Sequence, residues 1–247
     1  MDCLGFKHCI DRLCTWLLRQ EMVESYKHHI CISPLVVVVL NWGIDTLMIA
    51  VIDYKAGNLT SVLKSLRHLG AEVQVTDGDL SLVESAERIV LPGVGHFAAT
   101  ERLDSTGLTP AIRAAIARGV PFLGICVGMQ WLYAGSSEAP NQPGLAHFAE
   151  SCTHFADSKE KVPHVGWNSL EVQKNSRLLA GVEPGEFVYF THSYRAPVTV
   201  DTASITHYIE PFASAVERVN VMGVQFHPEK SGTTGLKILK NFLEVER

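Results

Sequence analysis

The chain has 247 residues, of which 47% are hydrophobic and 19% are charged, and its formal net charge is -5 at pH 7. This length is enough for one α/β domain with a sizeable core. The acidic balance, without any basic tract, excludes the electrostatic footprint of a nucleic-acid-binding protein. A small anionic or zwitterionic ligand is the better expectation.

Residues 1–47 differ in composition and sequence pattern from the rest of the chain. Four of the six cysteines fall here, and their spacing lacks the close C-x-x-C pairs of structural zinc sites. The apolar stretch at 33–53 is broken by polar residues before it reaches the ~20 residues of a membrane span, and no convincing signal sequence is present. We therefore expect no metal, no membrane span and a reducing, cytoplasmic setting. The segment itself is expected to be an N-terminal extension, either poorly ordered or an artefact of the start site.

From Met48 onward, strand-like and helix-like segments alternate. Short apolar runs predict strands at 48–53, 71–76, 88–92 and 120–125. Apolar residues at helical spacing predict a helix over 58–70, with Asn58 as its N-cap and Gly70 as its stop, and another over 109–119. This rhythm is typical of a doubly wound, mostly parallel sheet with helices on both faces. Such folds bind ligands beyond the carboxyl ends of their strands.

After Ser136 the pattern changes to short alternating strands and turns. These strands are expected in GWNSLEV (166–172), EFVYFTHSYRAPV (186–198) and SAVERVNVMGVQFHPE (214–229), followed by a last helix in TGLKILKNFLEV (234–245). We expect them to add antiparallel strands to the parallel sheet. Residues 48–247 would then form one domain.

The first motif with a chemical meaning is LPGVGHF at 91–97. Glycines on both sides of Val94 let its backbone N–H approach a ligand closely, as a donor of an oxyanion hole must. A plain glycine turn is the alternative interpretation.

The second motif, FLGICVGMQ at 122–130, ends an apolar strand in Gly-Ile-Cys-Val-Gly. Small residues on both sides of Cys126 leave room for a sharp strand-to-helix turn that presents the thiol to solvent, as in a nucleophile elbow. The start of the following helix favours a thiolate, and it directs the Val127 amide beside the sulfur as a second oxyanion donor. A buried structural cysteine is the alternative.

The third motif is GVQFHPEK at 223–230. His227 and Glu229 are two residues apart, so their side chains leave the same face of an extended chain. A reactive thiolate needs an imidazole as proton carrier, and the imidazole needs an acceptor that orients it. Alone, the motif is more typical of a solvated turn, but in combination with Cys126 it indicates a triad.

Together, PGVG, GICVGMQ, THSY and VQFHPEKS resemble the triad-type, or class I, glutamine amidotransferases, from Met48 to the C-terminus. Within that class, VPHVGWN at 162–168, YFTHSYRAPV and HPEKSG resemble the glutaminase subunit of imidazole glycerol phosphate synthase, an enzyme of histidine biosynthesis. The resemblance implies Cys126 as nucleophile, His227 as acid and base, and Glu229 as its orienter. It also implies hydrolysis of glutamine to glutamate and ammonia, without a cofactor, and delivery of the ammonia to a cyclase subunit in a heterodimer.

The resemblance further implies binding residues. Those expected to hold glutamine are Gly95, Gln130, His192, Ser193 and Tyr194. Those expected to meet the cyclase subunit are Trp167, Asn168, Tyr189 and Lys230. An ordinary core position is the alternative for Trp167.

Four other functions remain open at this stage. Another class I amidotransferase would use the same triad, as would a cysteine peptidase or a γ-glutamyl hydrolase, but each would leave VPHVGWN unexplained. A binding subunit without activity is disfavoured because all three members of the triad are present.

Overall fold

The computed structural model describes residues 47–56, 59–173 and 176–246. The expectations for residues 1–46 and for Asn58 as an N-cap lie outside the described residues.

An eight-stranded sheet in the order β2-β1-β3-β4-β13-β12-β11-β8 forms the centre of this fold. Neighbours are parallel from one edge as far as the fifth strand, through β2 (Glu72–Thr76), β1 (Met48–Ile52), β3 (Arg88–Gly93), β4 (Phe122–Cys126) and β13 (Val221–Val224). All residues of β3, β4 and β13 are buried, which explains why these strands are apolar apart from Arg88 at the start of β3. The predicted doubly wound sheet is confirmed.

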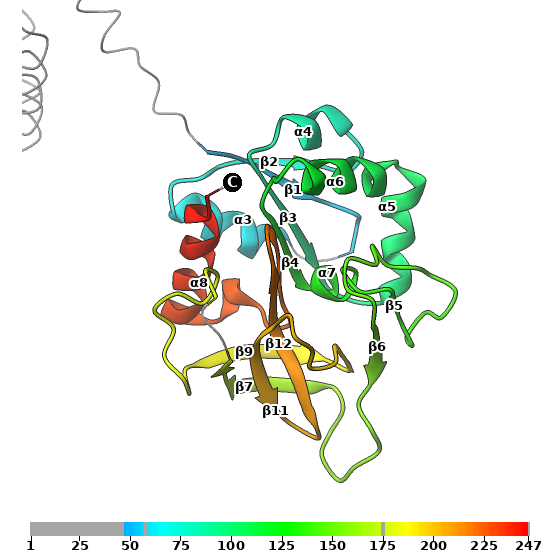
Figure 1. Cartoon of the computed structure of the whole chain (residues 1–247), viewed down its shortest axis with the longest axis vertical. Coiled ribbons are helices and arrows are strands. Elements are labelled where there is room, and N and C mark those ends of the chain that lie inside the picture. Colours follow the sequence, from blue (N-terminus) through cyan, green and yellow to red (C-terminus); the bar gives the residue numbers. More distant parts are fainter. Residues whose placement is uncertain (1–46, 57–58, 174–175, 247) are drawn as a thin grey trace, which may run out of the picture. The chain divides into compact units, whose positions relative to one another are not determined.

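Helices cover both faces of the parallel strands (Figure 1). One group contains α3 (Leu59–His68) and α8 (Gly232–Glu244), and the other contains α4 (Leu80–Ser85), α5 (Glu101–Ser105) and α6 (Leu108–Ala117). The chain leaves α3 at Gly70, as predicted, with a φ of 85° that favours glycine. None of the helices in the described ranges is both long and apolar enough to cross a membrane.

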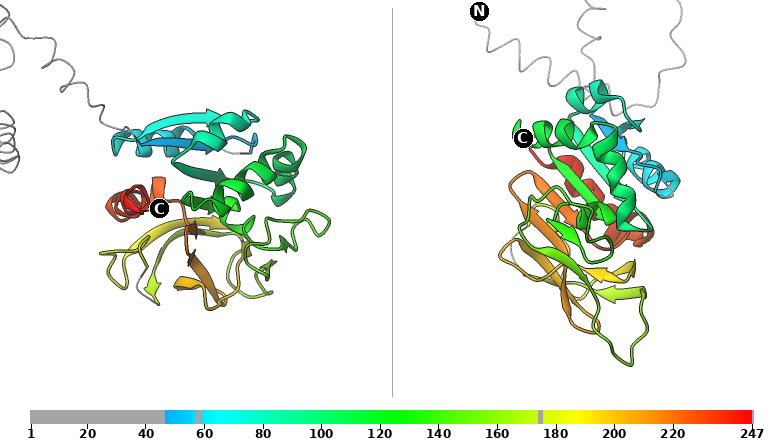
Figure 2. Two further views of the ribbon diagram at one scale, coloured as in Figure 1. Left: turned by 45° about the horizontal axis from the view of Figure 1, so that its top comes forward. Right: turned by 90° about the vertical axis from the view of Figure 1, so that its right-hand side faces the viewer.

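Most strands after Ser136 form a second region, beyond the parallel part (Figure 2). The exception is β13, which was expected among the antiparallel strands but pairs in parallel with β4. β12 (Pro211–Arg218), β11 (Thr202–His207) and β8 (Glu171–Val172) continue the large sheet. β7 (His164–Ser169) pairs with β9 (Phe187–His192) in a separate antiparallel ribbon. A third sheet is made of β10 (Tyr194–Arg195), β6 (Ser151–His154) and β5 (Gly135–Ser136).

Three short helical segments complete the described fold. They are α7 (Val127–Gln130) and the 3-10 helices η1 (Phe97–Thr100) and η2 (Pro228–Lys230). α7 directly follows β4, and η2 follows β13 within a few residues, so both begin at the carboxyl edge of the parallel strands. The chemical motifs of the sequence therefore meet at the edge where such sheets bind ligands.

Candidate active site

Cys126 lies at the junction of β4 and α7. Its φ of 54° and ψ of -110° form a backbone conformation that is uncommon outside glycine. A Cβ atom at Gly124 would overlap the carbonyl oxygen of Gly128, and one at Gly128 would overlap the carbonyl oxygen of Leu91 in β3. Both glycines of the Gly-Ile-Cys-Val-Gly motif are therefore required by close approach of the backbone around the turn.

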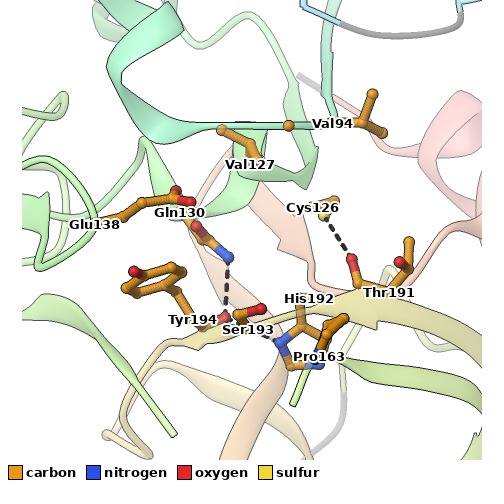
Figure 3. A pocket seen from close by; sticks show the side chains of 11 residues that line it. Val94, Cys126, Val127, Gln130, Glu138, Pro163, Thr191, His192, Ser193 and Tyr194 are labelled. Atoms are coloured by element: carbon orange, nitrogen blue, oxygen red, sulfur yellow. Dashed lines mark hydrogen bonds between the residues drawn. The ribbon is translucent and has the colours of Figure 1, made fainter.

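The thiol is more enclosed than the sequence suggested. Cys126 is only 3% exposed. Its Sγ lies 3.9 Å from the carbonyl oxygen of Thr191 in β9 and 3.6 Å from Nε2 of Gln225, one residue beyond β13. The expectation of a solvent-facing sulfur was wrong because β9 passes beside the elbow and covers it (Figure 3).

His227 and Glu229 form a buried pair. Nδ1 of His227 lies 2.9 Å from Oε1 of Glu229, and the two side chains are 2% and 5% exposed. Burial alone would lower the pKa of His227, but its interactions with Cys126 and Glu229 outweigh burial and raise that pKa to about 10. Nε2 of His227 forms no hydrogen bond with any described residue. The attraction between an imidazolium and a thiolate thus favours the protonated ring, and Nε2 is the atom left for proton transfer.

Strand β9 also positions the backbone at His227. The N–H of His227 donates to the carbonyl oxygen of Tyr189 at 2.9 Å. The N–H of Tyr189 donates in turn to Oγ of Ser231 at 2.9 Å, and that hydroxyl donates to the carbonyl oxygen of His227 at 2.6 Å. One strand therefore contacts both the thiol, through Thr191, and the imidazole-bearing residue, through Tyr189.

A cavity of about 220 Å³ opens in front of the thiol. It is smaller than the roughly 300–1,000 Å³ of pockets for drug-sized molecules, so it suits a smaller ligand. Its lining residues are Val94, Gly95, Cys126, Val127, Gln130, Glu138, Pro163, Thr191, His192, Ser193 and Tyr194 (Figure 3). The structure thus brings together, around Cys126, every residue that was expected to hold glutamine or an oxyanion.

Gln130 uses its amide nitrogen within the protein. Nε2 donates to the carbonyl oxygen of Tyr194 at 3.0 Å and to Oε1 of Gln225 at 3.1 Å. Both acceptors are oxygens, so the orientation of the Gln130 amide is determined by its partners. Its Oε1 is then the atom that remains for a ligand.

His192 is the end of a buried hydrogen-bonded chain. Its Nδ1 lies 2.9 Å from the carbonyl oxygen of Tyr194, and its Nε2 lies 3.0 Å from Nδ1 of His164. Nε2 of His164 lies 3.3 Å from Nδ2 of Asn168. Because a carbonyl only accepts, each imidazole carries its proton on Nδ1 and Asn168 donates into the chain. Burial lowers the pKa of His192 to about 3 and that of His164 to about 4, so both rings are neutral at pH 7.

The backbone N–H of Val94 is not directed at the thiol. It donates to the carbonyl oxygen of Ala56 at 3.3 Å, while Gly95 next to it has a φ of 90°. Ala56 lines a separate small space with His227 and Glu229 rather than the cavity in front of the sulfur. Val94 therefore lines the cavity, but in this state its backbone N–H donates to Ala56 and not into the cavity.

The ribbon of β7 and β9 presents an exposed apolar face. Trp167 pairs with Tyr189 across the ribbon, and Val165, Trp167 and Phe187 are each more than half exposed, at 57%, 55% and 57%. Lys230 joins this face, with Nζ 5.8 Å from the ring centroid of Tyr189. The exposure of Trp167 removes the core alternative for that residue.

Asn168 does not belong to the same face. It is adjacent to Trp167 in β7, so its side chain leaves the opposite side of the strand. There its Nδ2 contacts His164 and donates to the carbonyl oxygen of His207 at 2.9 Å. The structure therefore separates Asn168 from the other three residues that were expected at a partner.

Sequence reasoning missed several residues around the thiol. Gln225 and Thr191 contact the sulfur, and Glu138 lines the cavity while its Oε2 accepts the backbone N–H of Phe97 at 2.8 Å. Tyr54 is buried beside Gly93, and its pKa is raised by burial and by the neighbouring charge of Cys126. Gln225 and Thr191 stand inside the quoted motifs VQFHPEKS and THSY, and Gln225 is in addition a polar residue at the end of a fully buried strand.

Within the described ranges, no cluster of three or more histidine, cysteine, aspartate or glutamate side chains is suited to a metal ion. The two cysteines in those ranges, Cys126 and Cys152, are both free thiols.

Several known proteins are similar to this chain over most of its length. The family model Glutamine amidotransferase class-I matches residues 50–245. The imidazole glycerol phosphate synthase subunit HisH of Deinococcus radiodurans is 45% identical over 198 residues, which cover 78% of this chain and 92% of that protein. The subunit of the same name from Synechocystis sp. is 46% identical over 202 residues, covering 79% of this chain and 95% of the relative.

Solved structures agree on the fold. The crystal structure of a glutamine amidotransferase matches with a TM-score of 0.63 at 18% identity, over 79% of this chain and 97% of that one. PurLQS from Thermotoga maritima matches with a TM-score of 0.62 at 20% identity, over 80% of this chain and 98% of the other.

Proposed function

Because the chain belongs to the class I glutamine amidotransferases, and within them to the HisH subunits of imidazole glycerol phosphate synthase, we propose that it hydrolyses glutamine with Cys126, His227 and Glu229. The observation that carries this proposal is the position of a cysteine on a strained elbow, at the wall of a small cavity, beside a buried histidine–carboxylate pair. Cys126 is the nucleophile, His227 carries the proton, and Glu229 holds the imidazole by its Nδ1.

The reaction proceeds in two halves. The Cys126 thiolate attacks the side-chain carboxamide carbon of glutamine, and the resulting oxyanion collapses to a thioester as His227 gives the Nε2 proton to the departing ammonia. Water then attacks the thioester and yields its proton to His227, which releases glutamate and regenerates the thiolate. The Val127 amide, at the start of α7, donates to the oxyanion, and the Val94 amide does so after it leaves Ala56.

Glutamine would occupy the cavity in front of the sulfur. Glu138 supplies a carboxylate there for the α-ammonium group of the substrate, and Oε1 of Gln130 supplies a further acceptor. The backbone of Gly95 and of the segment 192–194 lines the remainder. These residues surround an amino-acid head group on several sides, which favours free glutamine over a peptide.

The exposed face of β7 and β9 is our proposed contact with a cyclase subunit in a heterodimer. Val165, Trp167, Phe187, Tyr189 and Lys230 form this face, which we call the ribbon face. Apolar residues gathered on one exposed surface are typical of a protein interface, and a tryptophan, a tyrosine and a cation are well suited to its centre. The ammonia released at Cys126 would serve the synthase reaction of that partner.

We also propose that residues 48–247 constitute the amidotransferase domain and that residues 1–47 are an extension to it. A cytoplasmic setting fits the free thiols of Cys126 and Cys152, because a reducing compartment preserves such groups.

The decisive experiment compares glutamine turnover by the parent chain and by Cys126→Ala, each mixed with the cyclase partner and its nucleotide ligand. We expect loss of ammonia release by at least about a thousandfold in the variant, because members of a triad work as a unit. Cys152→Ala is the matched control, since it removes the other described thiol, and it should retain turnover. Activity in a pure, folded Cys126→Ala sample would contradict the assignment.

A second substrate separates the closest alternative. A γ-glutamyl hydrolase would cleave γ-glutamyl peptides through the same triad, whereas an amidotransferase of this kind releases ammonia from free glutamine. Preferential cleavage of a γ-glutamyl peptide by the parent would overturn the proposed reaction and retain the triad.

A further inference from the structure

We propose that Gln225 is a hydrogen-bond donor to the nucleophile, and that its side-chain N–H stabilises the thiolate of Cys126. The inference rests on the proposed function of Cys126. It adds a fourth group to the triad, which donates a hydrogen bond but does not transfer its proton.

Gln225 reaches the sulfur from inside the protein. It lies one residue beyond β13 and is fully buried, and its backbone N–H donates to the carbonyl oxygen of Ser214 at 2.9 Å. Its Nε2 is 3.6 Å from Sγ of Cys126, within the range of a hydrogen bond to sulfur. Gln225 is not among the residues that line the cavity, so this contact leaves the ligand's side of the sulfur open.

The orientation of the Gln225 amide is determined by its neighbour. Nε2 of Gln130 has a carbonyl oxygen, that of Tyr194, as one acceptor, so this atom is the nitrogen of its amide. The atom of Gln225 that faces it at 3.1 Å must then be an acceptor, which makes it Oε1. The atom that faces the sulfur is consequently the amide nitrogen, and it carries a hydrogen toward Sγ.

A donor is needed at this place because the sulfur is poorly solvated. Cys126 is 3% exposed, and its nearest partner on β9 is a carbonyl oxygen, which accepts from a thiol but repels a thiolate. His227 supplies positive charge, but it gives its proton to ammonia during turnover. The Gln225 amide does not titrate, so it supports negative charge on sulfur both before attack and when the thioester is broken.

Other charged or titratable groups also face the sulfur and must stay constant in any test. His227, paired with Glu229, approaches from the end of β13, and Tyr54 approaches from the end of β1. His192 on β9 and Glu138 line the same cavity. A substitution at Gln225 removes none of these groups.

The test is the pH dependence of alkylation at Cys126 by iodoacetamide, followed by mass spectrometry of the peptide that contains Cys126. This readout needs no glutamine and excludes the thiols of residues 1–47. In Gln225→Met, which keeps the length of the side chain and removes the donor, we expect the midpoint of alkylation to rise by about one pH unit. Such a shift corresponds to the loss of one hydrogen bond to a charged group. Glutamine turnover with the cyclase subunit should show a lower kcat. KM should rise as well, because the variant also removes the acceptor that orients Gln130.

Two further variants keep the result interpretable. Gln225→Asn retains a buried amide but is too short to reach the sulfur, so it should shift the midpoint in the same direction and replaces the methionine variant if that one does not fold. Ser214→Ala breaks a buried 2.8 Å contact with Ser204 beside Gln225. It should lower thermal stability without moving the midpoint.

An unchanged midpoint in folded Gln225→Met and Gln225→Asn would overturn the inference, even if the parent hydrolyses glutamine. A shifted midpoint in a chain without glutaminase activity would support the donor role and refute the proposed function. An equal shift in Ser214→Ala would mean that general loosening, and not the donor, controls the thiol, which also overturns the inference.

Discussion

Two buried histidines, His164 and His192, are suited to a structural role rather than to proton transfer, because burial lowers the pKa of both rings. His164 and His192 are 4% and 6% exposed, and their hydrogen bonds to each other, to Tyr194 and to Asn168 together require both rings to be neutral. Aromatic rings surround them, with His164 stacked on Tyr208 at 4.1 Å and on Phe190 at 4.8 Å. A proton added to either ring would place a charge in apolar surroundings and would reverse the polarity of the chain that begins at Asn168.

We therefore predict acid destabilisation in a defined pH window. The folded pKa values of about 3 for His192 and about 4 for His164 lie below the roughly 6.5 of an unfolded histidine, so only the unfolded chain binds these protons as the pH falls below that value. The free energy of unfolding should decrease from about pH 6.5 toward pH 4, with up to two protons involved and a slope approaching about 2.7 kcal/mol per pH unit. Urea unfolding at several pH values measures this slope.

A matched pair of variants tests the origin of the slope. His164→Phe keeps a ring in the stack but removes one titrating group, so it should be less stable at pH 7 and show a shallower dependence below pH 6.5. His68→Gln, at an exposed position of α3, should leave the slope unchanged. An identical slope in His164→Phe and the parent would show that other groups cause the acid response.

At the scale of elements, the elbow between β4 and α7 is a tight junction. Gly128 approaches Leu91 of β3 so closely that a methyl group would meet a backbone carbonyl. Unlike a side chain, this carbonyl cannot rotate away. The positive φ of Cys126 produces the sharp bend of the chain at this junction.

We predict that Gly128→Ala abolishes glutaminase activity and lowers the free energy of unfolding by several kcal/mol, since overlap of backbone atoms is relieved only by moving strands. The matched control is Gly119→Ala, where φ is 86° but nothing lies within 4 Å of the added methyl group. That change should cost only about 1–2 kcal/mol, from the left-handed backbone conformation, and should retain activity. Thermal or urea unfolding of both variants, with the assay, decides the matter. Equal behaviour of the two variants would contradict the steric account.

The elements that were predictable and those that were not differ in their physical basis. The parallel strands and α3, α6 and α8 were visible because burial imposes apolar runs or helical spacing on their sequences. α4, α5, β5, β6 and β11 were not predicted: all five are only two to six residues long, and polar Thr202, Ser204 and Thr206 occupy buried positions in β11. The triad residues were likewise predicted from the sequence. The position of β9 over the sulfur was not, because contacts between Thr191 and Cys126 depend on how distant segments pack.

The ribbon face gives a prediction at the scale of the β7–β9 pair. Trp167 is half exposed and packs against Tyr189 with ring centroids 6.1 Å apart, so its truncation removes outward apolar area and little of the core. We expect Trp167→Ala to weaken binding of the cyclase subunit by at least about tenfold, as is typical of aromatic residues at the centre of an interface. Calorimetric titration with the partner measures this loss.

Val219→Ala serves as the control, because Val219 is 76% exposed but lies outside the ribbon face. It should bind the partner as the parent does. Parent-like affinity of Trp167→Ala would remove the ribbon face as the contact surface and leave the triad untouched.

For the molecule as a whole, the relevant feature is that one of the two proposed oxyanion donors, the Val94 amide, is engaged elsewhere in this state. The Val94 amide is bonded to Ala56, and the Gly-Val-Gly sequence around it allows the peptide to turn at modest cost. A missing oxyanion donor reduces the rate on the order of a hundred- to a thousandfold.

We predict that the isolated chain is a poor glutaminase and that the cyclase subunit with its nucleotide ligand raises turnover by about that factor. The partner can do so only if it binds the state with the turned peptide more tightly. Turnover measured for the chain alone, with the cyclase subunit, and with cyclase plus nucleotide would show a stepwise gain. Full activity of the lone chain would eliminate the switch but not the triad.

Strand β9 carries part of the proposed recognition surface and part of the proposed catalytic arrangement, but on different atoms. Its outward side chains, Phe187 and Tyr189, belong to the ribbon face, whereas its main-chain groups at Tyr189 and Thr191 contact His227 and Cys126. Main-chain groups are the same whatever side chain they bear, so substitutions on the outer side of the ribbon preserve these contacts. The surface can therefore diverge between lineages, or be redesigned for a new partner, while the catalytic arrangement is inherited unchanged.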